Sequence, residues 1–197
     1  MNIRIIPEDE ANDKFILKPL FEAMLKRLGK RDARVKIHPP DPAGWEGVKQ
    51  WKQIQQILSD FSEAQLFILC VDGDGHEHRK QILNDLERRA NEKLHYPRRL
   101  FLAEHAWQEV EVWALAGIDW RLKPKWTWEA IRSERDSKEH YFEPITKARS
   151  LFDLPGQGRK ELGIEAARNY AKIRQNCPEV RDLEDRIRQW IDVTAHR

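Results

Sequence analysis

The chain has little cysteine, no long apolar stretch and no surplus of charge of one sign, and each shortage excludes a class of protein. Its two cysteines, Cys70 and Cys177, lie far apart in a chain of 197 residues, so we expect neither a disulfide framework nor a zinc ribbon. No apolar run reaches the roughly 18 residues that a membrane-spanning helix needs. The N-terminal sequence lacks the basic and apolar regions of a signal peptide. We therefore expect a cytoplasmic protein that has no part in a membrane.

The charge balance is close to even, because 35 basic residues face 33 acidic ones and the formal net charge is +2. Overall charge therefore does not indicate a nucleic-acid partner, and such a partner has to be argued from local features. A hydrophobic content of 40% is enough for a globular core, and the length suits one core with a smaller appendage.

Strand-like and helix-like patterns alternate over the first 117 residues. Short β-rich runs cover residues 3–6, 34–38, 66–71 and 100–103, and helical spacing of apolar residues covers 14–28, 47–62, 82–90 and a stretch through Trp107 to Gly117. The run 66–71 is apolar on both faces, as in a central parallel strand, and makes Cys70 an ordinary buried thiol. We predict an α/β fold, a mostly parallel four-stranded sheet flanked by helices.

The remaining residues, 118–197, contain no convincing strand pattern. We predict a helical extension there that packs on the sheet domain of residues 1–117, and its apolar stripe offers a surface for a homodimer or a partner protein. The segment 120–128 interleaves tryptophans with basic residues. Such a segment can stack on bases and follow phosphates, but anchoring of the extension to the core is the favoured interpretation.

Acidic residues follow three of the four predicted strands. Glu8 and Asp9 follow the first strand, Asp72 and Asp74 the third, and Glu104 the fourth. Ligands of open parallel sheets bind outside the carboxyl ends of the strands, and neighbouring strands lie about 4.8 Å apart. Clustered carboxylates repel one another unless a cation lies among them, and hard oxygen ligands favour Mg²⁺ or Mn²⁺. The pattern predicts a metal site.

The two acids after the third strand alternate with glycines, Gly73 and Gly75, that let the backbone turn sharply. Both carboxylates can then point at one ion. The alternative is an ordinary strand-to-helix turn in which Asp74 caps the next helix.

The first strand end offers a proton-transfer group. Glu8 can act as general acid or base beside a metal-bound phosphate. Asp9 and Asp13 are further candidate ligands. Alternatively all three acids belong to a charged loop and the first turn of a helix, where the helix dipole favours acids.

The segment 103–113 is rich in acids among apolar neighbours. A continuous helix there places Glu104, Gln108 and Glu111 on one face and turns Glu109 aside. Charges in apolar surroundings need partners, so we expect Glu104, Glu109 and Glu111 to include metal ligands or members of ion pairs. A polar stripe on an amphipathic helix is the alternative.

Basic residues follow the Asp-Gly-Asp-Gly turn. His76, Arg79 and Lys80 are candidates for contact with a phosphate or a nucleic-acid backbone. The alternative is that they are solubilising surface charge.

The order of these acids resembles the Toprim domain, the catalytic domain of topoisomerases, primases and the OLD-like nucleases of bacterial phage defence. The resemblance rests on Glu8 after the first strand, Asp72-x-Asp74 after a later one and Glu104 or Glu109 beyond. The chain looks most similar to small stand-alone bacterial Toprim-like proteins, whose later motif places acids just before a Trp-containing helix. The resemblance covers about residues 1–117.

The resemblance implies that Glu8 is the general acid or base and that Asp72 and Asp74 bind metal, with the later glutamates completing a second metal position. It implies a Mg²⁺- or Mn²⁺-dependent nuclease that acts on DNA or RNA, with a role in phage defence. In those nucleases Gly directly follows the first Glu and an acid lies four residues on, whereas this chain has Asp9 and Asn12.

Two alternatives to a nuclease stay open. The departure at Asp9 favours a non-catalytic, metal-binding sensor or assembly subunit with the same fold. A phosphatase of the haloacid dehalogenase type also uses Asp-x-Asp, but its motif lies near the start of the chain, and here it begins at Asp72 and is followed by Gly75.

Overall fold

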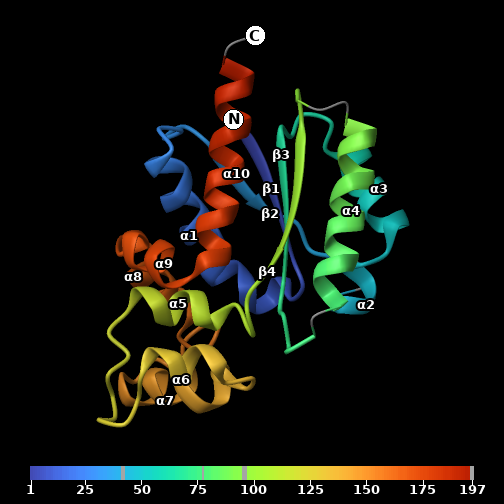
Figure 1. Cartoon of the computed structure of the whole chain (residues 1–197). Coiled ribbons are helices and arrows are strands. Elements are labelled where there is room, and N and C mark those ends of the chain that lie inside the picture. The colour runs from blue at the N-terminus through green and yellow to red at the C-terminus, as the bar shows by residue number, and fades with distance from the viewer. Residues whose placement is uncertain (41–42, 77, 95–96, 196–197) are drawn as a thin grey trace.

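Four parallel strands form the centre of the protein. The computed structural model describes residues 1–40, 43–76, 78–94 and 97–195. The strands, in the order β2-β1-β3-β4 across the sheet, are β1 (Asn2–Pro7), β2 (Arg34–Ile37), β3 (Leu66–Val71) and β4 (Leu100–His105) (Figure 1). The predicted α/β fold with a four-stranded parallel sheet is confirmed.

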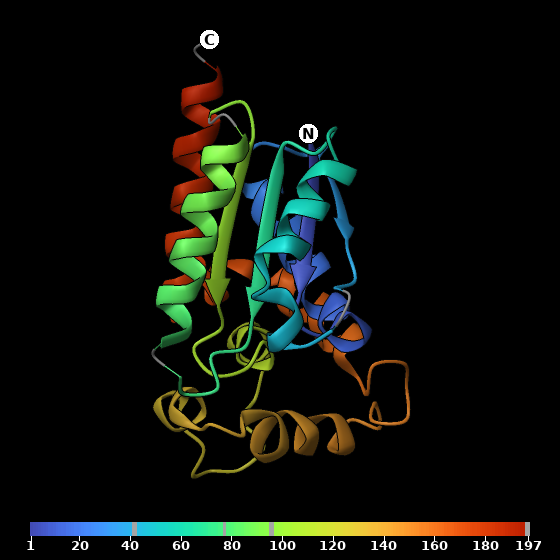
Figure 2. The same cartoon turned by 90° about the vertical axis from the view of Figure 1, so that its right-hand side faces the viewer.

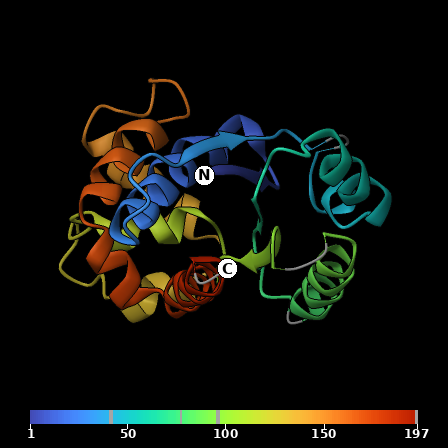
Figure 3. The same cartoon turned by 90° about the horizontal axis from the view of Figure 1, so that it is seen from above.

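Helices cover both faces of this sheet, and Figure 3 shows the three layers from above. The helices are α1 (Glu10–Arg27), α2 (Trp45–Val48), α3 (Trp51–Asp60), α4 (His78–Leu94), α5 (Glu111–Gly117), α6 (Trp128–Ser133), α7 (Glu143–Ala148), α8 (Arg159–Arg168), α9 (Tyr170–Asn176) and α10 (Pro178–Ala195), and a π-helical turn η1 (Lys138–Phe142) precedes α7. All six residues of β3 are buried, which is the reason for its unbroken apolar sequence.

The side chains of β3 divide the core into two parts. Ile68 and Cys70 face the core shared with α1, α5 and the C-terminal helices. Phe67 and Leu69 face the smaller core formed with α3 and α4. This division follows from the alternation of side chains along a strand.

Within residues 118–195, which the structure describes, the regular elements are all helices, joined by loops. Helix α10 lies along β4, while α6 and α7 lie beyond the carboxyl ends of the strands (Figure 2). Leu162 and Leu183 from this region share one buried cluster with Ile5 and Trp113. The extension therefore completes the core on one face of the sheet, and the domain boundary at residue 117 stays a prediction.

Helix α1 begins earlier than the predicted residue 14 and contains Pro19 in its interior. Proline has no N–H, so the carbonyl of Phe15, four residues earlier, has no helical donor. Gly163 of α8 lies against this carbonyl, and a Cβ at that position would come within 2.2 Å of the oxygen. The close approach of α8 accommodates the irregularity in α1.

Two other predicted helices were wrong in extent. The predicted helix 47–62 is divided into α2 and α3. The predicted continuous helix through Trp107 begins only at Glu111, because Glu104 is still in β4 and the backbone between them bonds to the loop after β3. Glu104 and Glu111 therefore do not share a helix face. Of the helices in the described ranges, none has the length and apolar character to cross a membrane.

Candidate metal and catalytic site

The loop after β3 is bound tightly to the segment that follows β4. The N–H groups of Gly73 and Asp74 donate to the carbonyl of Gln108 at 2.7 and 3.1 Å. The N–H of Val110 donates to Oδ1 of Asp72 at 2.8 Å. A Cβ on Gly73 would lie 2.4 Å from the carbonyl oxygen of Trp107, so only glycine fits there.

The backbone turns through the left-handed region at Asp74 and Gly75, with φ angles of 46° and 67°. Glycine adopts this region freely, and Asp tolerates it better than most residues do. Asp74 pairs with Nη2 of Arg79 at 2.8 Å. Such conformations persist where the surroundings hold them, and they are frequent at functional sites.

Glu8 lies next to this loop, as the sequence predicts for adjacent strand ends. Its Oε2 accepts the N–H of Asp72 at 3.2 Å and lies 3.4 Å from Nη1 of Arg79. Burial raises the pKa of Glu8, with a further contribution from the charge of Asp74, while Arg79 and the Asp72 N–H act in the opposite direction. The structure thus brings Glu8, Asp72 and Asp74 together.

Asp13 and Glu111 are two further buried acids whose charges act on Asp72. Asp13 and Glu111 are only 6% and 5% exposed. Burial raises the pKa of Asp13 to about 8, and the charge of Glu111 adds to the shift. Burial also raises the pKa of Asp72 well above its ordinary value, with added repulsion from Asp13, Glu111 and Glu8. These carboxylates are close enough to disfavour one another's ionisation.

We call Glu8, Asp13, Asp72, Asp74 and Glu111 the carboxylate cluster. Its members come from the segment after β1, from α1, from α5 and from the loop after β3, and all lie at the carboxyl edge of the sheet. Two arginines face these five carboxylates: Arg79 contacts Glu8 and Asp74, and Arg159 donates from Nε to Oε1 of Glu111 at 2.7 Å. The acids outnumber the guanidinium groups.

Asp9 and Asp13 also begin helix α1, as the alternative interpretation of the first acids proposes. Asp9 is the N-cap, and its Oδ1 accepts the N–H of Ala11 at 2.9 Å. Oδ2 of Asp13 accepts the N–H of Asp9 at 3.0 Å. Asp9 is exposed and acts as a cap, whereas Asp13 combines capping with a place in the carboxylate cluster.

Glu104 forms ion pairs on the edge strand β4. It contacts Lys80 at 2.7 Å, Arg186 at 3.0 Å and Nδ1 of His105 at 3.3 Å. Burial alone would raise the pKa of Glu104, but His105, Lys80 and Arg186 outweigh it and lower the pKa. Glu104 therefore already has cationic partners.

Glu109 is held at the base of the helical extension. It accepts the hydroxyl of Ser137 at 2.9 Å and the N–H of Lys138 at 2.7 Å. Burial raises the pKa of Glu109 to about 7, and the charge of Glu111 contributes to the shift. Glu109 is thus a neighbour of the carboxylate cluster that is anchored to a different element.

The predicted nucleic-acid contacts have different surroundings. His76 is exposed, and Lys80 has 40% of its side chain exposed beside Glu104. Arg79 is only 6% exposed, and its contact with nucleic acid stays a prediction. Its guanidinium bonds to Glu8, Asp74 and the carbonyl of Asp72 and lies 4.6 Å from the ring of Trp45.

Arg159 was not among the predicted site residues, and Asp13 was ranked below Glu8. Asp13 lies on the buried stripe of α1 with Ile16, Leu17 and Leu20, so its position among core residues was a usable signal. Arg159 meets Glu111 across 48 residues of sequence, and no local pattern marks that pairing.

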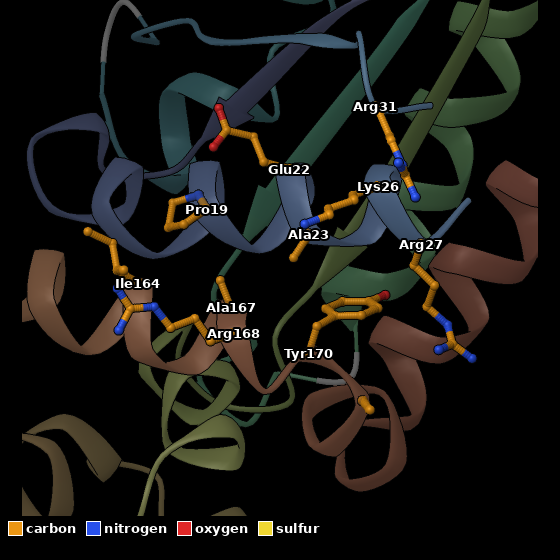
Figure 4. Close-up of a pocket in the computed structure, with 11 residues that line it drawn as sticks. Pro19, Glu22, Ala23, Lys26, Arg27, Arg31, Ile164, Ala167, Arg168 and Tyr170 are labelled. Carbon is orange, nitrogen blue, oxygen red and sulfur yellow. The ribbon is translucent and has the colours of Figure 1, made fainter. Parts of the chain in front are cut away.

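A cavity of about 740 Å³ lies elsewhere, between α1 and the α8–α9 region (Figure 4). Most of its charged lining is basic, from Lys26, Arg27, Arg31 and Arg168. A smaller cavity of about 370 Å³ adjoins the loop after β3 and is lined by Gly73, Gly75, His76, Lys80, His105, Trp107 and Gln108. Only the smaller cavity shares a loop with the carboxylate cluster.

The donor atoms of the carboxylate cluster are all carboxylate oxygens, which suit Mg²⁺ or Mn²⁺. Across the described ranges, no group of three or more His, Cys, Asp or Glu side chains is arranged as a metal site. Arg79 and Arg159 lie among the carboxylates instead. A divalent cation would therefore have to compete with these two guanidinium groups.

The fold and the site define a three-layer α/β protein with an acidic cluster at the carboxyl edge of a parallel sheet. Comparisons with family models, with curated proteins and with solved structures each find no match.

Proposed function

We propose that this protein is a Mg²⁺- or Mn²⁺-dependent nuclease that hydrolyses phosphodiester bonds of nucleic acid. One observation carries the proposal: Glu8 and Asp72 are joined by a 3.2 Å hydrogen bond at the sheet edge where Asp13 and Glu111 are buried. Buried carboxylates in excess of their cationic partners are costly, and a bound cation removes that cost. Open parallel sheets bind ligands at this edge.

Asp72, Asp13 and Glu111 are the residues that would hold the cation, with Asp74 next to them. When bound, a divalent cation polarises the phosphate and favours hydroxide over water. The hydrogen bond from Val110 fixes one oxygen of Asp72, and the Asp9 N–H fixes one oxygen of Asp13. Both carboxylates are thereby oriented before a ligand arrives.

Glu8 manages the proton in this proposal. The attacking water gives a proton to the Glu8 carboxylate while the water oxygen bonds to phosphorus. The bond between phosphorus and the leaving oxygen breaks, and Glu8 then returns the proton to the leaving oxygen. Burial raises the pKa of Glu8, which makes it a better proton acceptor. The N–H of Asp72 orients its carboxylate through Oε2.

The test is cleavage of supercoiled plasmid, single-stranded DNA and RNA with Mn²⁺ or Mg²⁺. Asp72→Asn keeps an acceptor for the N–H of Val110, so we expect a folded protein that cleaves at least about 100-fold more slowly. The matched control is Asp119→Asn, which changes an exposed acid and should cleave like wild type. Equal cleavage by Asp72→Asn and wild type would contradict the proposal.

A second function is favoured by Arg79, whose guanidinium contacts both Glu8 and Asp74. If the Arg79 guanidinium permanently occupies the place of a divalent metal ion, the protein is a non-catalytic sensor or assembly subunit. Such a protein leaves every nucleic-acid substrate intact. Turnover of p-nitrophenyl phosphate alone would instead indicate a phosphatase. A cytoplasmic location and a role in phage defence stay predictions, the latter from the Toprim resemblance.

A further inference from the structure

The smaller cavity lies directly beside the carboxylate cluster. The loop after β3 supplies Gly73 and Gly75 to the cavity and Asp72 and Asp74 to the cluster. The cavity volume of about 370 Å³ lies within the range of roughly 300–1,000 Å³ typical of sites for small ligands. The residues that line the cavity in this loop are thus direct sequence neighbours of the proposed catalytic carboxylates.

Trp107 presents a large apolar surface at this cavity. It is 51% exposed, the largest exposure among the big hydrophobic side chains of the described residues. The guanidinium of Arg132 lies 5.7 Å from its ring centroid. The backbone carbonyl of Trp107 packs against Gly73, and this contact holds the backbone that carries the indole ring. An exposed indole is a platform on which a flat aromatic group can stack.

Gln108 provides an unused hydrogen-bond acceptor in the same cavity. The residue is 9% exposed, and its side-chain Oε1 has no hydrogen-bond partner. Buried polar atoms nearly always have a partner, so this oxygen points to a missing donor. Its backbone carbonyl is held by the N–H groups of Gly73 and Asp74, which fixes the position of the residue.

The remaining polar lining is basic. Lys80, His76 and His105 contribute nitrogen atoms, and Nε of Arg135 lies 3.9 Å from the site of a Cβ on Gly75. This lining suits an anion such as a phosphate. Lys80 also pairs with Glu104 at 2.7 Å, so a phosphate would share this cation with the carboxylate. The cavity therefore combines a stacking surface, a hydrogen-bond acceptor and basic side chains.

We propose that this cavity binds the base and phosphate of an unpaired nucleotide in single-stranded DNA or RNA. Trp107 stacks on the base, Oε1 of Gln108 accepts an N–H from the base edge, and Lys80 and His76 face the phosphate. A base inside a duplex cannot reach this position without leaving its stack. The inference rests on the proposed nuclease function and names its substrate as single-stranded nucleic acid.

The test measures binding of fluorescent 12-nucleotide single strands and of a duplex by anisotropy, with EDTA present to prevent cleavage. Trp107→Ala should weaken single-strand binding about tenfold, and Trp107→Phe should restore part of it. Gln108→Met, which removes the acceptor at similar length, should weaken it about fivefold. The control Leu122→Ala, at another exposed apolar residue, should bind like wild type.

Equal single-strand affinity in wild type, Trp107→Ala and Gln108→Met would overturn the inference, as would a preference for the duplex. Parallel titrations with DNA and RNA strands decide which of the two is bound more tightly. Cleavage kinetics separate this inference from the proposed function. If Asp72→Asn loses cleavage but Trp107→Ala leaves KM unchanged, the nucleotide-binding role of the cavity is refuted and the nuclease activity is not. If binding depends on Trp107 but wild type cleaves no substrate, the nuclease activity is refuted and the nucleotide-binding role is not.

Discussion

Two buried acidic sites in this protein differ in their balance of charge. Glu184 on α10 is fully buried and contacts three arginines, Arg27 at 3.4 Å, Arg174 at 3.1 Å and Arg188 at 2.7 Å, and it accepts the hydroxyl of Tyr170 at 2.7 Å. In the carboxylate cluster, five acids face the two guanidinium groups of Arg79 and Arg159.

The comparison shows that burial of acids alone does not identify a functional site. Glu184 connects α1, α9 and α10, and its negative charge is fully matched, so it is a structural group. In the carboxylate cluster burial raises the pKa of Asp13 and Asp72, and repulsion among the acids adds to the shift. A site that stays short of positive charge is suited to a cation.

The largest expected effect is on stability at the matched site. Glu184→Leu leaves the buried hydroxyl of Tyr170 without its acceptor and separates three arginines from their shared partner. We expect a loss of about 2–3 kcal/mol in the free energy of unfolding, measured by urea denaturation. The control Glu165→Gln removes a partly exposed ion pair with Arg149 and should cost less than about 1 kcal/mol. Equal losses in the two variants would show that the buried contacts of Glu184 stabilise the fold no more than a partly exposed ion pair does.

The next effect concerns the loop that positions the cluster. Gly73→Ala places a methyl group 2.4 Å from the carbonyl of Trp107 and 2.5 Å from that of Ala106, neither of which can move independently. We expect a loss of about 2 kcal/mol, since overpacking against backbone forces it to shift. Thermal unfolding measures this loss, and a melting temperature equal to that of wild type would contradict the close packing of the two loops.

A third effect is a dependence on pH, which is measured as a slope over several pH units and is therefore not ranked as a single loss. The pKa of Asp13 is raised from 3.8 to about 8 by burial, so its neutral form is favoured in the folded protein. A raised pKa gives stability that is full below about pH 4 and is lost as the pH rises to about 8. Without divalent cations we expect a loss on the order of 1 kcal/mol per pH unit in this window.

Asp13→Asn tests that origin, because an amide keeps an acceptor for the Asp9 N–H and cannot ionise. Urea denaturation between pH 4 and pH 8 should show a shallower decline for this variant than for wild type. Identical slopes would mean that Asp13 ionises freely in the folded protein. The carboxylate cluster would then not differ from the Glu184 site in the ionisation of its acids.

The sequence allowed most of the sheet to be predicted, because its strands are short apolar runs that end in turn residues. The run 66–71 is the clearest case, since both of its faces are buried. The start of α5 was not predictable from periodicity, because Asp72 and Gly73 capture the backbone groups of Val110 and Gln108 from a distant part of the chain. Long-range hydrogen bonds override a local helical pattern there.

The candidate site was predictable in part for the same reason. Glu8, Asp72 and Asp74 follow strands that pair directly, so the topology alone brings them together. Glu104 lies near the carboxyl end of the neighbouring strand β4, but Lys80 and Arg186 pair with it, and neither pairing has a local signal in the sequence. Sheet topology predicts which acids reach the edge, whereas their counter-ions are set by tertiary packing.

The central claim is that the carboxylate cluster is short of positive charge and binds a divalent cation. Isothermal calorimetry with Mn²⁺ at pH 7.5 tests it most directly in wild type, Asp72→Asn and the control Glu165→Gln. We predict saturable binding to wild type and to the control, and an affinity at least about tenfold lower for Asp72→Asn. No Mn²⁺ binding to wild type, or equal binding to wild type and Asp72→Asn, would contradict the claim.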